Sequence, residues 1–129
     1  MKTLNQVALL LAVATVPGCI AAAAAAGAGG AVYVTTRGAE AVVEGQPASL
    51  EPRIRGALTH YNVSVTGTST ENGGDKQSWE GKAGDLEVSV TAERQSPTTT
   101  KLTVTAKRNV ADWDKEFAEQ VLQRVVSSE

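Results

Sequence analysis

Apolar and polar residues alternate with a period of two along several short stretches of the chain. The clearest is residues 86–92, LEVSVTA, where every second residue is apolar and those between are charged or hydroxylated. Residues 39–44 and 102–106 repeat the pattern, and residues 63–66 and 76–82 carry it more weakly, with Trp79 on the apolar side. Such alternation is typical of a strand with one face in the core and the other in water. The pattern therefore predicts four to five strands.

Two longer segments carry apolar residues at helical spacing. The first ends near Tyr61, with Pro47 and Pro52 restricting its start and Asn62 placed to end it in the left-handed conformation. Its apolar residues share one face: Leu50, Ile54, Ala57, Leu58 and Tyr61. The second begins at about Asp112, which we expect to be its N-cap. Its apolar residues recur every four positions: Trp113, Phe117, Val121 and Val125.

The order strand, helix, four strands, helix predicts an α+β fold. We expect an antiparallel sheet of four to five strands with two helices packed on one face, in the order β-α-β-β-β-β-α. The other face would be wet and rich in Ser, Thr, Glu and Lys, and Glu40 and Glu44 fall on it. The turn ENGGD at residues 71–75 fits a tight hairpin. This domain is expected to cover residues 37–129.

The N-terminal residues have the composition of a secretory signal. Lys2 lies in a short polar start, and an apolar run of ten residues extends from Val7 to Val16. Pro17 and Gly18 then precede Cys19, the only cysteine in the chain. An internal disulfide is therefore impossible.

The residues around Cys19 resemble a bacterial lipobox. Val16 matches the aliphatic position, Gly18 the small residue and Cys19 the acceptor of diacylglycerol, whereas Pro17 departs from the usual small residue. The resemblance implies that residues 1–18 are a cleaved signal peptide and that acylated Cys19 binds membrane lipid. Ile20 stands where many enterobacterial lipoproteins of the inner membrane have aspartate. The implied location is the outer membrane, facing the periplasm.

A tract of alanine and glycine follows the lipobox. Residues 20–30, IAAAAAAGAGG, cannot form a core, and we interpret residues 19–36 as a tether. The tract lacks the spacing of a phosphate-binding loop. One alternative stays open: residues 3–36 carry no charge and are long enough to span a membrane, although Pro17 and Gly18 interrupt the run.

Few residues offer catalytic or metal-binding chemistry. The chain has 12 basic and 14 acidic residues and no basic cluster longer than a pair, which argues against nucleic acid as a partner. His60 is the only histidine, which argues against a zinc site. It also argues against a catalytic triad, because the chain has no motif that marks a nucleophilic serine. Asp112, Asp114 and Glu116 lack the remainder of a calcium loop and favour a helix start instead. We expect no enzyme activity, cofactor or metal.

Beyond Cys19 the whole chain resembles small bacterial lipoproteins that are catalogued only as a domain of unknown function. The matching features are the tract to Gly30, Tyr33 ahead of a strand, Gly38, the first helix, the strands and the segment from Trp113 onward. The resemblance implies a periplasm-facing lipoprotein and brings no catalytic residue. We therefore expect a membrane-anchored, non-catalytic binding or scaffold module that contacts an envelope protein or the cell wall.

A small-ligand carrier is the alternative function for the folded part. Trp79, Trp113 and Tyr61 would then line a space between the helices and the sheet.

Overall fold

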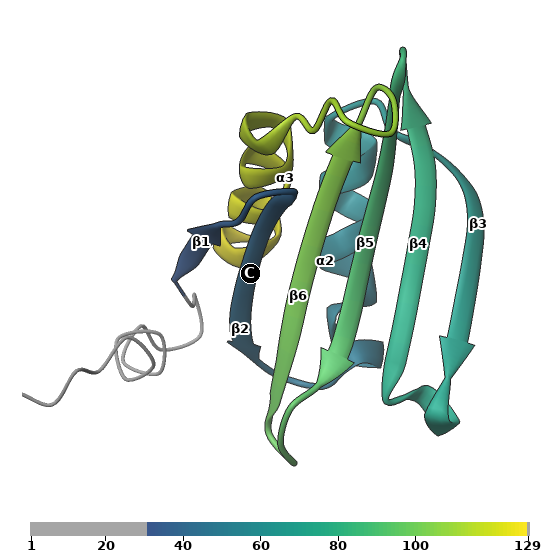
Figure 1. Ribbon diagram of the computed structural model, residues 1–129. Helices are drawn as coiled ribbons and strands as arrows, with labels where there is room; N and C mark the ends of the chain where they lie inside the picture. Colours follow the sequence, from purple (N-terminus) through teal and green to yellow (C-terminus); the bar gives the residue numbers. More distant parts are fainter. Residues whose placement is uncertain (1–30, 129) are drawn as a thin grey trace, which may run out of the picture.

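The sheet and its helices form one α+β unit, shown in Figure 1. A computed structural model describes residues 31–128 of the chain. The elements are β1 (Val32–Val34), β2 (Gly38–Glu44), α2 (Pro47–His60), β3 (Ser64–Glu71), η2 (Asn72–Gly74), β4 (Lys76–Ala83), β5 (Leu86–Arg94), β6 (Thr99–Lys107) and α3 (Lys115–Ser127). All neighbouring strands are antiparallel, in the order β1-β2-β6-β5-β4-β3. The predicted α+β class is confirmed, with six strands where four to five were expected.

The additional strand is β1, which lies inside the segment predicted to be tether. Val32 pairs with Ala41 and Val34 with Ala39 of β2. The turn between the two strands is closed by Thr35, whose hydroxyl accepts from the backbone N–H of Gly38 at 3.0 Å. Three residues are too few to show an alternation, and β1 is held by its pairing with β2 and by Val32, which packs against the core. The sheet thus begins before the expected domain boundary at residue 37.

The core lies between one face of the sheet and the two helices. The alternating apolar residues of β2, β5 and β6 are buried as predicted, with Val90 and Leu102 fully inaccessible. Trp79 of β4 also points toward the helices and is 2% exposed. Because most buried residues on this side of the sheet are Ala, Val and Leu, the helices pack closely on it, and Ile54 of α2 and Leu122 of α3 are fully buried.

Both ends of α2 follow from local sequence. Gln46 is the N-cap, and its backbone N–H donates to the Ser49 hydroxyl at 3.0 Å, while Pro47 occupies the first helical position. At the other end Asn62 adopts a φ of 57°, as predicted. The left-handed residue turns the chain directly into β3.

The start of α3 differs from the prediction. The N-cap is Asp114, whose carboxylate accepts from the backbone N–H of Phe117 at 2.9 Å, and not Asp112. The reason is tertiary: Trp113 forms an isolated bridge with Lys107, and the N–H of Asp114 donates to the carbonyl of Ala106 at 2.7 Å. After the bends at residues 108–111 the chain therefore runs beside the end of β6 at Trp113, which lies outside the helix.

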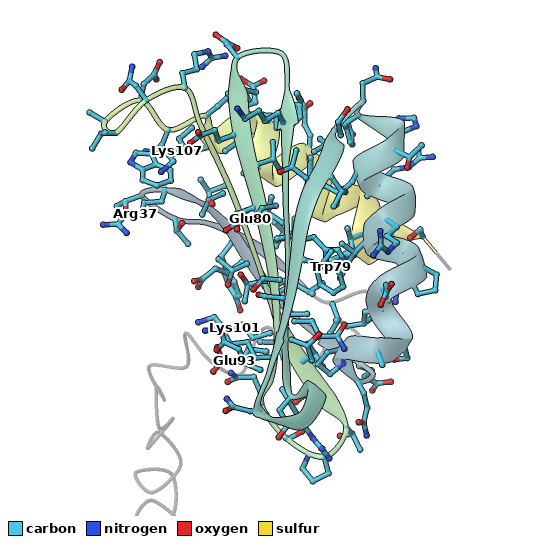
Figure 2. All side chains as sticks on the ribbon, turned by 90° about the vertical axis from the view of Figure 1, so that its right-hand side faces the viewer. Arg37, Trp79, Glu80, Glu93, Lys101 and Lys107 are labelled. Atoms are coloured by element: carbon cyan, nitrogen blue, oxygen red, sulfur yellow. The ribbon has the colours of Figure 1, made fainter. Side chains whose placement is uncertain are left out.

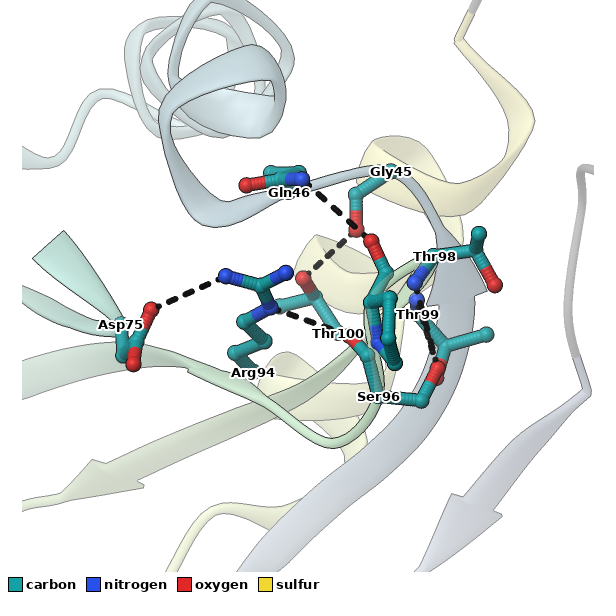
Figure 3. A network of polar contacts seen from close by, with 9 residues as sticks. Gly45, Gln46, Asp75, Arg94, Ser96, Thr98, Thr99 and Thr100 are labelled. Carbon is teal, nitrogen blue, oxygen red and sulfur yellow. Dashed lines mark hydrogen bonds and ion pairs between the residues drawn. The ribbon is translucent and has the colours of Figure 1, made fainter.

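A network of polar contacts joins the β2–α2 connection to the β5–β6 turn (Figure 3). Thr100 is completely buried, and its hydroxyl donates to the carbonyl of Gly45 at 2.8 Å. The backbone N–H of Gly45 donates to the carbonyl of Thr98 at 2.8 Å, and the Gln46 side chain donates to the carbonyl of Pro97 at 3.3 Å. These bonds satisfy groups that the core would otherwise leave unpaired, so their role is structural.

Candidate interaction face

The face of the sheet that points away from α2 and α3 has no helical cover within residues 31–128, and we call it the open face. Figure 2 shows Trp79 between the sheet and the helices, whereas Arg37, Glu80, Glu93, Lys101 and Lys107 lie on the opposite side. The reason is the period-two pattern, which sends every second side chain of β4, β5 and β6 away from the core.

Strand register arranges most charges of the open face in two rows, with Glu80 between them opposite Ser89. In one row Lys82 lies opposite Glu87, and Glu87 lies opposite Lys107. In the other row Lys76, Glu93 and Lys101 are matched in the same way. Lys107 Nζ lies 3.8 Å from a Glu87 carboxylate oxygen, and Lys101 Nζ lies 3.6 Å from Glu40 Oε1. These pairs are exposed and contribute little stability, but they give the face both signs of charge.

Hydroxyl side chains fill the space between the two charged rows. We call these residues the hydroxyl belt: Ser78, Ser89, Thr91, Thr103 and Thr105. Ser89 pairs with Thr105, and Thr91 pairs with both Ser78 and Thr103, the hydroxyls of Ser78 and Thr91 lying 3.4 Å apart. Hydroxyls donate and accept, so the belt presents an ordered set of hydrogen-bonding groups.

Trp113 lies at one end of the open face, where it adds an aromatic surface to the polar groups. The Arg37 guanidinium carbon is 5.4 Å and Lys107 Nζ is 5.6 Å from the centroid of its ring, within the range of cation–π attraction. A depression of about 390 Å³ lies beside it. Its lining includes Trp113, Glu80, Ser89, Thr105, Lys107 and Thr66.

The prediction that Trp113 belongs to the second helix was wrong, because the spacing from Trp113 to Phe117 fits a helix although Trp113 lies before its first turn. Asp112 and Asp114 both suit an N-cap by composition, so only the pairing of Trp113 with Lys107 decides between them. No local signal separates the two alternatives.

Arg108 organises the acidic residues beside Trp113. Its guanidinium lies 3.0 Å from Asp114, 3.4 Å from Asp85 and 3.9 Å from Asp112. The pKa of Arg108 is raised above its usual value, chiefly by the hydrogen bond to Asp114. The acids are therefore held around a guanidinium, and residues 31–128 contain no group of three potential ligands suited to a metal.

The remaining candidate residues lie apart from one another. His60 is exposed at the end of α2 and makes an edge-on contact with Tyr61, with ring centroids 4.9 Å apart. Tyr61 contacts Phe117 of α3, Trp79 is in the core, and Trp113 is on the open face. These aromatic residues do not line one common space between helices and sheet.

The two edges of the sheet are unequal. β1 has three residues, whereas β3 has eight, all of them exposed. Within residues 31–128, β3 pairs only with β4, so its outer backbone edge has no strand beside it. Its sequence SVTGTSTE contains one charge, Glu71 at the end.

Comparison with known proteins finds no matching family model, no matching curated protein and no matching solved structure. The resemblance to small lipoproteins therefore stays a prediction. Among residues 31–128, no helix has both the length and the apolar character needed to cross a membrane. The lipobox residues Val16, Pro17, Gly18 and Cys19 lie outside the described residues.

Proposed function

We propose that the chain is a non-catalytic module of the bacterial cell envelope that binds a partner through the open face. In this proposal acylated Cys19 holds it in membrane lipid, with the outer membrane and the periplasmic side as its location. The observation that supports the binding role is the open face itself, a polar surface ordered by strand register and bounded by Trp113 at one end.

The chemistry of the open face favours a polar protein surface as partner. Charges of both signs lie side by side on it, which suits a complementary surface of mixed charge better than a polyanion. The hydroxyl belt supplies donors and acceptors, and Trp113 belongs to the residue type most enriched among energetically dominant interface positions. A small-ligand carrier finds less support, because Trp113 lies on the open face, whereas Trp79 and Tyr61 pack in or against the core on the helix side.

The anchor and the open face are separated by a short stretch of chain. Residues 20–31 lie between Cys19 and β1. Twelve residues span at most about 40 Å when fully extended. A partner bound by the open face would therefore lie close to the membrane, which fits a component of the envelope.

A photo-crosslinking amino acid at position 80 tests the proposal. Glu80 is exposed on the open face beside Trp113, and Thr59 is a matched exposed position on α2. With the full-length chain in living bacteria, we expect discrete adducts from position 80, few from position 59, and loss of the position-80 adducts when Trp113→Ala is added. Equal adducts from both positions, or none from position 80, would contradict the open face as a binding surface.

A further inference from the structure

The free edge of β3 is built for pairing with another strand. Its eight residues are exposed, the backbone groups that point away from β4 pair with no strand within residues 31–128, and neither proline nor lysine interrupts the edge. Natural sheets usually block such an edge with charge, proline or a covering element, because an open edge recruits further strands. Apart from the charge of Glu71 at its end, the one protective feature of β3 is a bulge between Val65 and Gly67.

The bulge limits regular pairing to residues 67–71. Beyond it, Thr68 lies opposite Trp79 and Thr70 lies opposite Gln77, so both threonines face the helix side. Ser69 lies opposite Ser78, on the same side as the open face. Side chains directly opposite in an antiparallel pair point to the same face, which restricts the registers that a new strand can take.

We propose that this edge pairs with β3 of a second copy of the chain, antiparallel and about a twofold axis through Ser69. In that register Thr68 lies opposite Thr70 of the second copy, Ser69 lies opposite its own equivalent, and Gly67 lies opposite Glu71. Each pair shares a face, and the threonine pairs are favourable cross-strand partners. The open faces of both copies join into one surface, with all helices behind it.

The charge pattern favours a second copy in this orientation. Glu71 is the only charged residue of β3, and antiparallel pairing places the two copies of Glu71 at opposite ends. Parallel pairing would set them side by side, which is unfavourable. Gly67, which has open space around its α-carbon, leaves room for the Glu71 side chain that comes to lie beside it.

The twofold arrangement is also closed. Pairing β3 with β1 of another copy would use a strand of three residues and would generate an open-ended array, whereas twofold symmetry ends at two chains. Five residues per strand make a small interface, so we expect a weak dimer that high local concentration on a membrane promotes. This pairing does not depend on the open face having a partner.

A cysteine at position 69 traps the dimer directly. In the full-length chain with Cys19→Ser, Ser69→Cys is the only thiol. Opposite α-carbons in an antiparallel pair lie about 4.5–5.5 Å apart, within disulfide range. Because Cys19→Ser also removes the proposed anchor, the chain is purified and oxidised at high concentration, where we expect a disulfide-linked species of twice the chain mass to form about tenfold faster than with either control. The controls are Ser78→Cys, one strand inward on the same face, and Ser127→Cys, exposed at the end of α3.

Charge substitutions then test the register. Adding Thr68→Lys with Thr70→Lys sets lysine opposite lysine at two pairs and should slow crosslinking about tenfold. Adding Thr68→Lys with Thr70→Glu sets lysine opposite glutamate and should restore it. Both side chains are exposed, and circular dichroism checks that the fold is kept. Crosslinking equal at positions 69, 78 and 127, insensitive to these charges, or giving an adduct of another mass would overturn the proposal.

Discussion

Gly38 shows how closely single residues are constrained where β2 meets β6. A β-carbon at this position would overlap the carbonyl oxygen of Val104 on the neighbouring strand. Gly56, by contrast, lies in α2 with nothing within 4 Å of such an atom. The two glycines are therefore present for different reasons, and the sequence alone does not distinguish them.

The same substitution at both glycines should have opposite effects. Gly38→Ala should lower the free energy of unfolding by about 2 kcal/mol, because the strands must separate locally to admit the methyl group. Gly56→Ala should raise it by roughly 0.5–1 kcal/mol, because alanine favours the helix. Chemical denaturation measures both values. A neutral Gly38→Ala variant would show that β2 does not approach β6 this closely.

The pattern of apolar residues predicts the position of Trp79 but not that of Trp113. Trp79 lies within an alternating segment, and its burial follows directly from the period of two. Trp113 lies at helical spacing from Phe117, yet it is held on the open face by Lys107 and Arg37. Its position depends on contacts between distant segments, so the most distinctive residue of the candidate site could not be located from the sequence.

Among the elements, those with a buried face show a clear alternation of apolar and polar residues, and those without one show it weakly or not at all. β2, β5 and β6 bury every second residue, and their alternation is clear. β3 lies outside the cover of the helices, so none of its residues is buried, and Val65 is 37% exposed. β1 is too short for a pattern. The open edge of the sheet was therefore visible only once the strand order was known.

The start of α3 provides a test at the scale of an element. Asp114→Ala should lower the free energy of unfolding by about 1 kcal/mol, because it removes the hydrogen bond to the Phe117 N–H. Asp112→Ala should change it by less than about 0.5 kcal/mol, because Asp112 contributes only a surface ion pair to Arg108. Thermal and denaturant unfolding compare the two variants. A larger loss for Asp112→Ala would place the helix start where the sequence pattern did.

At the scale of the whole molecule, the sheet divides the chain into a structural side and a binding side. Both helices and all the large buried side chains lie on one side. Hydrogen bonds and ion pairs around Thr100 and Arg108 stabilise the connecting loops at the ends of the sheet. This leaves the open face free of any part in the core. Its residues can therefore be changed without loss of the fold, which makes the proposed binding role testable by surface substitution.

The membrane anchor is the remaining property of the whole molecule. If Cys19 is acylated, Cys19→Ser should abolish the incorporation of labelled fatty acid and release the chain from the membrane fraction, because the thiol is the only attachment point. Ile20→Asp should keep the label and shift the chain from the outer to the inner membrane, as the lipoprotein resemblance implies. Metabolic labelling and membrane fractionation measure both. Membrane association of Cys19→Ser without label would favour a spanning segment over a lipid anchor, within the part of residues 3–36 that precedes β1.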